Sequence, residues 1–350
     1  MTVPASTTTS DGDCLPAITG PVGLLCSIES RVSSMLLRAL FTACLLLGLV
    51  ACPAACQDWN SLIVKADSLF NEQNYDSAAI FGRAAVALAE KSRGLQDSVV
   101  ARLLTRVGLF YLGDARTIRR RDHDRAKAEA SLKRSLEIRE KLFGREHLEV
   151  AASLFQLGLF YNAAWPHALG EQCLRDALAI RLRLLEPNDK LIADNYFYLA
   201  LVCGNQNKLD QEQSYYDKAL QIRERILEPD DPDIARALMS LSNLYGKIGD
   251  HDKALQAGRR AYSIYLKHFG PEQIQVAKTI NNLGSEYYEM GNFAQSERCF
   301  LEALTTKEKL LKPDNPDLCT TLLGLWDLYC ALGRFTEAEK LYLRSLAIFQ

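Results

Sequence analysis

Residues 277–304 read AKTINNLGSEYYEMGNFAQSERCFLEAL, and this stretch decides the fold. Its first half places Ile280, Leu283 and Tyr287 at steps of three and four residues, so these side chains share one face of a helix. A Gly-Asn pair at 291–292 interrupts the pattern, and a second apolar face begins directly after it. The stretch therefore predicts two consecutive helices joined by a tight turn.

The same pattern returns along the chain at a fixed spacing. Short proline-containing segments begin at Leu185, Leu227, Phe269 and Leu311, each 42 residues after the one before. A period of about 20–50 residues is typical of a repeat array, in which each unit is one small motif stacked on the next. The chain contains seven such units, whose starts are 42 residues apart except for one interval of 50 residues. Their first helical positions are Trp59, Ala101, Ala151, Ala193, Ala235, Ala277 and Cys319.

The last two units carry the fullest set of recurring residues, which are Asn282, Leu283, Gly284, Tyr287, Gly291, Phe293, Phe300, Ala303, Leu304, Leu325, Tyr329, Gly333, Phe335, Ala338, Tyr342 and Leu346. These residues resemble the tetratricopeptide repeat, and more narrowly the 42-residue variety found in kinesin light chains. The resemblance implies an all-α, right-handed superhelical solenoid of antiparallel helix pairs over residues 58–350. It implies protein binding without naming a partner, because many binding proteins share this fold.

Some positions depart from the pattern. The second unit has eight extra residues, which include the basic cluster Arg116–Arg121. This cluster is either a solvated loop or a contact for acidic lipid or protein. Glu212 stands where the resemblance implies Ala, and Trp326 takes the eighth place, which is small in the other units. We expect the last helix pair to open around this ring, or the ring to point elsewhere.

Residues 1–57 have a different composition. Between Arg38 and Asp58 there is no charged residue, and the apolar run that ends at Cys52 is 14 residues long, fewer than the roughly 20 that span a bilayer. The run predicts a signal segment. Its final Leu-Val-Ala-Cys resembles the lipobox of bacterial lipoproteins, which implies lipidation of Cys52, a membrane tether and a place in the cell envelope. Plain secretion, a retained anchor and a cytoplasmic protein without export are the alternatives.

Composition and motifs argue against several functions. Lys+Arg 41 and Asp+Glu 43 give a net charge of -2, whereas a dedicated nucleic-acid binder needs a basic face. The sequence has no phosphate-binding loop, nucleophile elbow or Cys-x-x-Cys, and its five histidines lack metal-ligand spacing. A helical solenoid also has few buried clefts in which the pKa values of an acid and a base are tuned. We therefore expect no enzyme activity, nucleic acid, cofactor, metal or small-molecule substrate.

The inner wall of such a superhelix is formed by the first helix of each unit. Its fifth and ninth places hold Phe155, Leu159, Phe197 and Leu201 in units three and four, which predicts a continuous apolar strip for a partner. Alternatively, these side chains fill the interior or meet a neighbouring helix. Beside the strip we expect a further apolar contact, amides that bond a peptide backbone, and positive charge along one side. These residues are Met239, Asn243, Asn281, Arg236 and Lys278.

Two functions fit these observations. The first is a non-catalytic scaffold that binds a peptide or a partner segment in the concave groove. The second is a regulatory or sensor arm of a larger enzyme or envelope complex. Some relatives grip a C-terminal carboxylate through Lys at the fifth place, and no unit here has Lys at that place. We therefore do not expect a carboxylate clamp of that kind.

Overall fold

The structure is a computed structural model that describes residues 58–113, 122–164 and 166–349. The signal segment with Cys52 and the Arg116–Arg121 cluster lie outside the described residues. Backbone contacts divide the chain between Gln57 and Asp58, and the second part is one compact unit. The helices of this part are α2 Trp59–Asn71, α3 Tyr75–Arg93, α4 Ser98–Leu112, α6 Asp122–Phe143, α7 Leu148–Ala164, α8 His167–Leu184, α9 Lys190–Asn205, α10 Leu209–Ile226, α11 Pro232–Ile248, α12 His251–Phe269, α13 Ile274–Glu289, α14 Phe293–Leu310, a short 3₁₀ helix Pro316–Leu318, α15 Cys319–Ala331 and α16 Phe335–Phe349.

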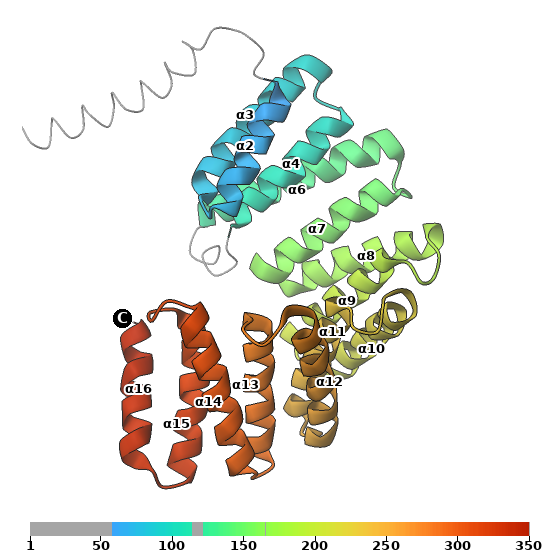
Figure 1. Cartoon of the computed structure of the whole chain (residues 1–350). Helices are drawn as coiled ribbons and strands as arrows, with labels where there is room; N and C mark the ends of the chain where they lie inside the picture. The colour runs from blue at the N-terminus through green and yellow to red at the C-terminus, as the bar shows by residue number, and fades with distance from the viewer. Residues whose placement is uncertain (1–57, 114–121, 165, 350) are drawn as a thin grey trace, which may run out of the picture. The chain divides into compact units, whose positions relative to one another are not determined.

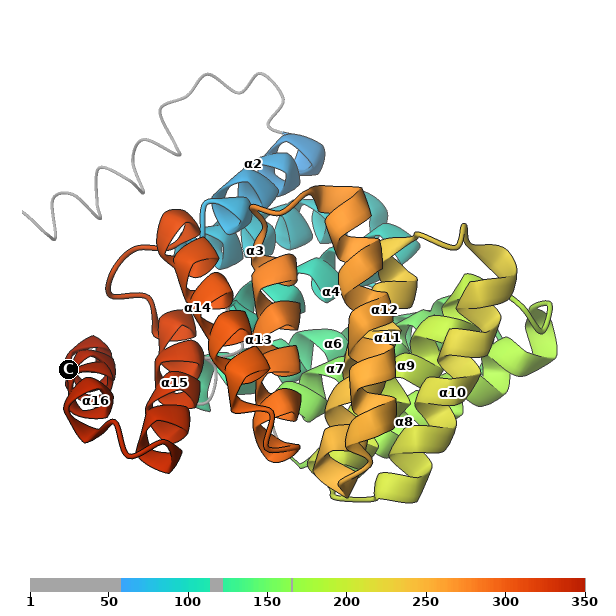
Figure 2. The same ribbon diagram turned by 60° about the horizontal axis from the view of Figure 1, so that its bottom comes forward.

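Each helix packs against the helix before it and the helix after it. The pairs run antiparallel and stack in chain order from α2/α3 to α15/α16, as two views of the molecule show (Figure 1 and Figure 2). Every regular element of the described residues is helical, which confirms the predicted all-α repeat solenoid. The first helices of units two to six begin three residues before the predicted unit starts, for example at Leu148 rather than Ala151.

Polar caps fix where the first helices begin. Asp97, Asp189 and Asp231 each accept a hydrogen bond from the backbone N–H two residues further on, at 2.7 Å. Such a cap satisfies one of the donors that the first turn of a helix leaves free. The short segments between units therefore carry the residues that set where the next first helix begins.

A left-handed residue makes the turn between the two helices of a unit. Gly249, Gly291 and Gly333 have φ between 73° and 89°, a region that residues with a side chain seldom adopt. In the first and fourth units the non-glycine residues Gln73 and Asn207 take the same conformation, with φ of 62° and 58°. The glycines of units five to seven therefore make these turns without strain.

Small residues allow the paired helices to touch. A Cβ added to Gly158 would lie 2.5 Å from Leu174 Cγ and 3.2 Å from the carbonyl oxygen of Gly170, both on α8. This supports the interpretation that the eighth place must be small where helices approach closely. The exception, Trp326, is half-buried and packs against Tyr342 of α16, with ring centroids 5.6 Å apart.

Candidate functional site

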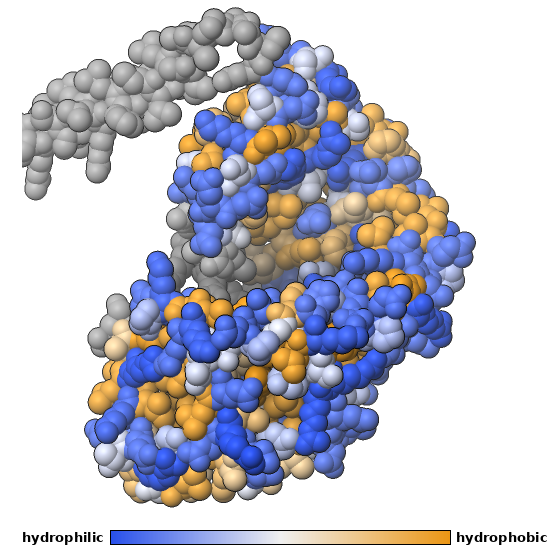
Figure 3. Space-filling model, viewed as in Figure 1, coloured by the Kyte–Doolittle hydropathy of each residue, from blue (hydrophilic) through white to orange (hydrophobic). Residues whose placement is uncertain are grey.

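The first helices of the units form the inner wall of the array. Neighbouring first helices contact each other directly at α4–α7, α7–α9, α11–α13 and α13–α15, in addition to their own partners. Figure 3 shows the hollow that the curved array partly encloses, with hydrophobic side chains on its inner wall. The predicted strip and the predicted amides all come from these first helices, as the unit numbering indicated.

Phe197 is not an exposed member of the wall. Its side chain is 4% exposed and belongs to a core cluster with Tyr216 and Leu241. Two guanidinium groups cover the ring, that of Arg223 at 4.7 Å and that of Arg236 at 5.0 Å from the ring centroid. The alternative that these side chains fill the interior therefore holds for Phe197, and the prediction that it belongs to an exposed apolar strip is wrong.

The other members of the strip are half-buried and are not joined into one surface. Phe155 lies under the guanidinium group of Arg181, which is 4.5 Å from the ring centroid. Tyr198 contacts both phenylalanines edge to face, at 5.4 Å from Phe155 and 5.5 Å from Phe197. Phe155, Leu159 and Leu201 remain partly accessible. The apolar wall of units three and four is therefore a set of half-buried side chains with a tyrosine between the two rings.

Buried cations on the second helices bond to the first helices that form the inner wall. Arg139, Arg181, Arg223 and Lys307 occupy one equivalent place in the second helices, at multiples of 42 residues, and all four are buried. Each reaches the first helix of the next unit. Arg181, for example, donates to the carbonyl oxygen of Leu191 at 2.8 Å and to Asn195 Oδ1 at 3.0 Å. Because a buried charge is costly without partners, these bonds fix how consecutive units stack.

Arg223 shows how such a cation also holds an aromatic ring. Its side chain is 1% exposed, donates to the carbonyl oxygen of Asp233 at 3.0 Å and pairs with Asp194 Oδ1 at 2.9 Å. The same guanidinium group lies over Phe197. The sequence reasoning missed this set of residues. The signal was present, since the cations repeat with the same phase as the turns.

Units five to seven present a polar hollow of about 700 Å³ on the inner wall. Its lining comes chiefly from α11, α13 and α15, and it includes four of the predicted residues, namely Met239, Asn243, Lys278 and Asn281. The hollow thus brings the predicted amides together. The other lining residues are Asn282, Ser285, Lys307, Asp317, Thr320, Leu323, Gly324 and Asp327.

The amides of the hollow are partly engaged. Asn243 is exposed, and its Oδ1 accepts a hydrogen bond from Asn282 Nδ2 at 2.6 Å. Asn281 is only 8% exposed, and its Oδ1 accepts a hydrogen bond from the Thr321 hydroxyl at 2.7 Å. Among the described residues no hydrogen bond is found for Asn281 Nδ2, although this side chain lines the hollow. A donor is therefore left for a bound carbonyl group.

The predicted positive edge is neutralised within the chain. Lys278 Nζ lies 3.1 Å from a carboxylate oxygen of Asp317, and Arg236 lies 3.0 Å from Asp233. These two side chains line the wall as predicted, but they do not present free positive charge. Asp233 lies in the first turn of the same helix as Arg236, and Asp317 lies in the 3₁₀ helix that precedes the first helix of the next unit.

Lys307 is a cation that the hollow does not expose. It is 1% exposed, and its ammonium group donates to the carbonyl oxygen of Asp317, to Thr320 Oγ1 and to Thr321 Oγ1, at 2.8–3.1 Å. Burial lowers the pKa of Lys307 to about 8, although the carboxylate of Asp317 opposes this shift. The three bonds use all its donors, so Lys307 stiffens the floor of the hollow.

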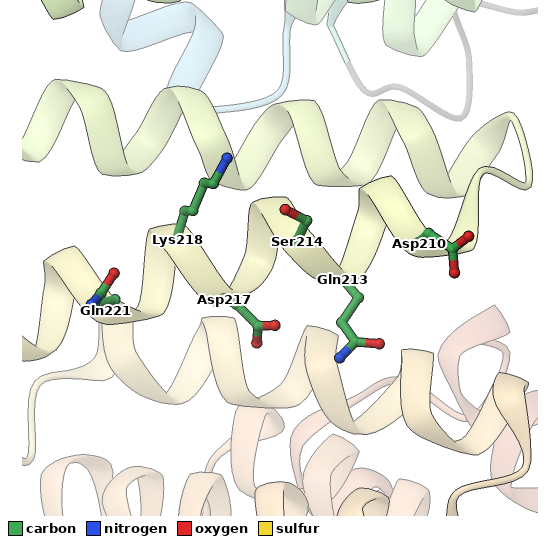
Figure 4. Close-up of a pocket in the computed structure, with 6 residues that line it drawn as sticks. All are labelled: Asp210, Gln213, Ser214, Asp217, Lys218 and Gln221. Atoms are coloured by element: carbon green, nitrogen blue, oxygen red, sulfur yellow. The ribbon is translucent and has the colours of Figure 1, made fainter.

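A second polar hollow lies on α10 and does not make a convincing site. Its lining residues all come from this one helix, and Figure 4 shows Lys218 and Asp217 pointing to different sides of it. Elsewhere in the described ranges no group of His, Cys, Asp or Glu is arranged to hold a metal ion. No helix in the part of the chain that the structure describes is long and apolar enough to cross a membrane.

Comparison with known proteins agrees with this architecture. Models of the tetratricopeptide repeat match residues 210–267 and 275–350, and another model of that repeat matches residues 117–149. The chain carries tetratricopeptide repeats. The matches indicate no catalytic family. No curated protein sequence matches the chain significantly.

Solved structures of other repeat proteins resemble the array. A kinesin light chain-type protein of Podospora anserina with nearly identical TPR-like repeats is 18% identical, with a TM-score of 0.51, over 58% of this chain and 96% of that one. A Rap protein complexed with competence and sporulation factor is 18% identical, with a TM-score of 0.56, over 83% of this chain and 74% of that one. A signal transduction ATPase from Pyrococcus horikoshii with a tetratricopeptide repeat sensor is 14% identical, with a TM-score of 0.63, over 82% of this chain and 41% of that one.

Proposed function

We propose that the protein is a non-catalytic scaffold that binds an extended peptide or partner segment along the inner wall of its repeat array. One observation carries this proposal. Side chains from three successive first helices converge on one hollow, and they leave an amide donor free inside it. Asn243 and Asn281 lie on successive first helices, and amides suit an extended chain because they can pair with its backbone groups. The resemblance to a Rap protein complexed with a factor supports the same conclusion.

The half-buried apolar residues extend this binding surface toward the first half of the array. Leu159 and Leu201 are partly accessible beside the arginine-covered rings, and they offer a seat for an apolar side chain of the partner. Phe155, Phe197 and their guanidinium groups then serve as the rigid wall behind that seat. A partner that follows the groove would therefore place an apolar residue at units three and four and polar backbone at units five to seven.

Retention of random-sequence peptides by the full chain tests this function. We expect peptides retained by the wild-type chain to lose at least about 2 kcal/mol of binding free energy with Leu159→Ser or Asn243→Ala, because both groups face the groove. The matched control is Leu301→Ser, which changes an exposed leucine on the second helix α14. Retention that Leu159→Ser and Asn243→Ala leave unchanged would argue against a groove-binding scaffold.

A sensor arm of a larger assembly is the second candidate function. Its support is the resemblance to the tetratricopeptide repeat sensor of a signal transduction ATPase, of which the chain covers 41%. Purification of the native protein from its cells, followed by sizing of the complex, separates the two functions. A stable complex with an ATPase favours the sensor arm, whereas a free protein that retains peptides favours the scaffold.

Export to the cell envelope, with a lipid on Cys52, is a further part of the proposed function. Its support is the apolar run that ends in Leu-Val-Ala-Cys. Mass spectrometry of the native N-terminus tests it directly. A diacylglyceryl group on an N-terminal Cys52 is the expected result. An unmodified N-terminus that starts at Met1, or at Met35 as an alternative start just before the apolar run, would contradict export.

A further inference from the structure

The polar hollow of units five to seven has an asymmetric charge distribution. Its two lysines are already committed, Lys278 to the carboxylate of Asp317 at 3.1 Å and Lys307 to three oxygen atoms beneath the surface. Asp327, on α15, lines the same hollow and is exposed. Among the described residues Asp327 has neither an ion pair nor a side-chain hydrogen bond. One carboxylate thus faces the hollow without a cation.

The charge of a second acid acts on this carboxylate. Burial raises the pKa of Asp327, and the charge of Glu289 at the end of α13 raises it further. Glu289 is itself exposed and has no ion pair among the described residues. The charge of Glu289 therefore acts on Asp327 in the hollow, and a cation bound at Asp327 would relieve that repulsion.

An independent feature points to a ligand at the same place. Asn281 is more than nine-tenths buried and lines the hollow, and its Oδ1 is bonded to Thr321. Its Nδ2 has no partner in the described part of the chain, so it is a donor available to a ligand in the hollow that Asp327 also lines. A peptide carbonyl group fits this donor, and a basic side chain of the same peptide would be directed to Asp327 in the same hollow.

We propose that this hollow selects a segment with a basic side chain, lysine or arginine, which pairs with Asp327 while the segment's backbone bonds Asn281 and Asn243. This inference rests on the proposed groove function and adds the chemistry of the partner to it. An acidic segment does not fit equally well, because it would first have to displace Asp317 from Lys278. The arrangement thus discriminates by an unpaired charge as well as by shape.

Two matched peptide pools test the selectivity. Both have random sequence apart from one fixed position, which is arginine in one pool and its uncharged isostere citrulline in the other. We expect the full chain to retain the arginine pool about tenfold more strongly, since a charge-assisted hydrogen bond contributes about this factor. The preference should fall at high salt. Equal retention of the two pools would overturn the inference.

Variants of Asp327 test whether this residue causes the preference for arginine. Asp327→Asn should lower the retention of the arginine pool about tenfold and leave the retention of the citrulline pool unchanged. Asp327→Lys should turn the preference toward a third pool with glutamate at the fixed position. The control is Asp252→Asn, an exposed acid on the second helix α12. An arginine preference that survives Asp327→Asn would also overturn the inference.

The outcome also separates this inference from the function on which it rests. If Asn243→Ala lowers the retention of both pools while Asp327→Asn changes neither, the groove binds peptides and the basic selectivity is wrong. If neither pool is retained in a way that depends on Asn243, Leu159 or Asp327, the proposed groove function fails as well. Each of these results therefore either supports or contradicts a specific step.

Discussion

The two halves of the inner wall use equivalent places in the repeat for different purposes. In units three and four the fifth places hold Phe155 and Phe197, whose rings are covered by arginines from the second helices. In units six and seven the corresponding second-helix cation, Lys307, bonds to threonines and a carbonyl group beneath a polar hollow. In the first half the inward side chains therefore pack against other side chains of the protein, whereas in the second half polar groups remain available to a partner.

This difference teaches that a place in a repeat does not by itself make a residue a ligand contact. Whether an inward side chain is accessible depends on the neighbouring unit. Phe197 is buried because Arg236 of the next first helix and Arg223 of its own unit both lie on its ring. Asn243 is exposed because its neighbour Asn282 is short and bonds to it from the side.

The largest effect should come from Phe197→Ala. Because the ring is buried and packed against Tyr216, its removal should lower the free energy of unfolding by about 3–5 kcal/mol. Asn243→Ala, at an exposed place in the polar half, should change it by no more than about 0.5 kcal/mol. Urea denaturation of both variants measures the contrast. Equal stability of the two variants would show that the halves do not differ in packing.

A smaller effect should follow from Arg223→Met, which keeps the length of the side chain and removes its charge. Asp194 and the carbonyl oxygen of Asp233 then lose their donor, and hydrogen bonds to charged groups contribute about 1.5–3 kcal/mol. We expect a loss of about 2 kcal/mol in thermal or urea unfolding. Arg225→Met on the same helix, where the guanidinium group is exposed, is the control. If Arg223→Met leaves the free energy of unfolding unchanged, this cation does not hold the apolar half together.

The smallest effect should appear at Glu212, on α10 next to the boundary between the two halves. The side chain is 9% exposed, and its Oε2 has no hydrogen-bond partner. Burial raises the pKa of Glu212, which Lys247 only partly offsets. The folded state therefore favours the neutral acid. Glu212→Gln should raise the free energy of unfolding by about 1 kcal/mol at pH 7, and this gain should vanish as the pH falls below the ordinary value of 4.5.

Glu171 provides the control of opposite sign. It is buried to a similar extent, but hydrogen bonds from Lys208, Arg175 and Gln206 overcome the effect of burial and lower its pKa to about 2. The stability that Glu171 contributes is present above pH 4.5 and is lost as the pH falls toward 2. Glu171→Gln should therefore destabilise the chain at pH 7. Unfolding curves at pH 7 and pH 4 measure both variants. If both substitutions change the free energy of unfolding in the same direction, the hydrogen bonding seen around these two acids is contradicted.

The sequence by itself determined the repeat, the helices and the direction in which side chains point. The 42-residue phase places Asn243, Ser285 and Asp327 at equivalent positions, and a helix of 3.6 residues per turn then sends them to one wall. Small residues such as Gly158 and the capping acids could also be located from the pattern, because each acts within one unit. For this reason the fold and the location of the groove followed from local physical rules.

Only the tertiary structure decided which groups on that wall are accessible. The burial of Phe197 under Arg236 and the pairing of Lys278 with Asp317 both depend on side chains from the next unit. Long flexible cations reach across from one helix to the next, and their partners depend on distances between helices that the spacing of residues within one helix does not fix. The stacking of the units thus decides whether a side chain on the wall is accessible, whereas the single helix decides in which direction that side chain points.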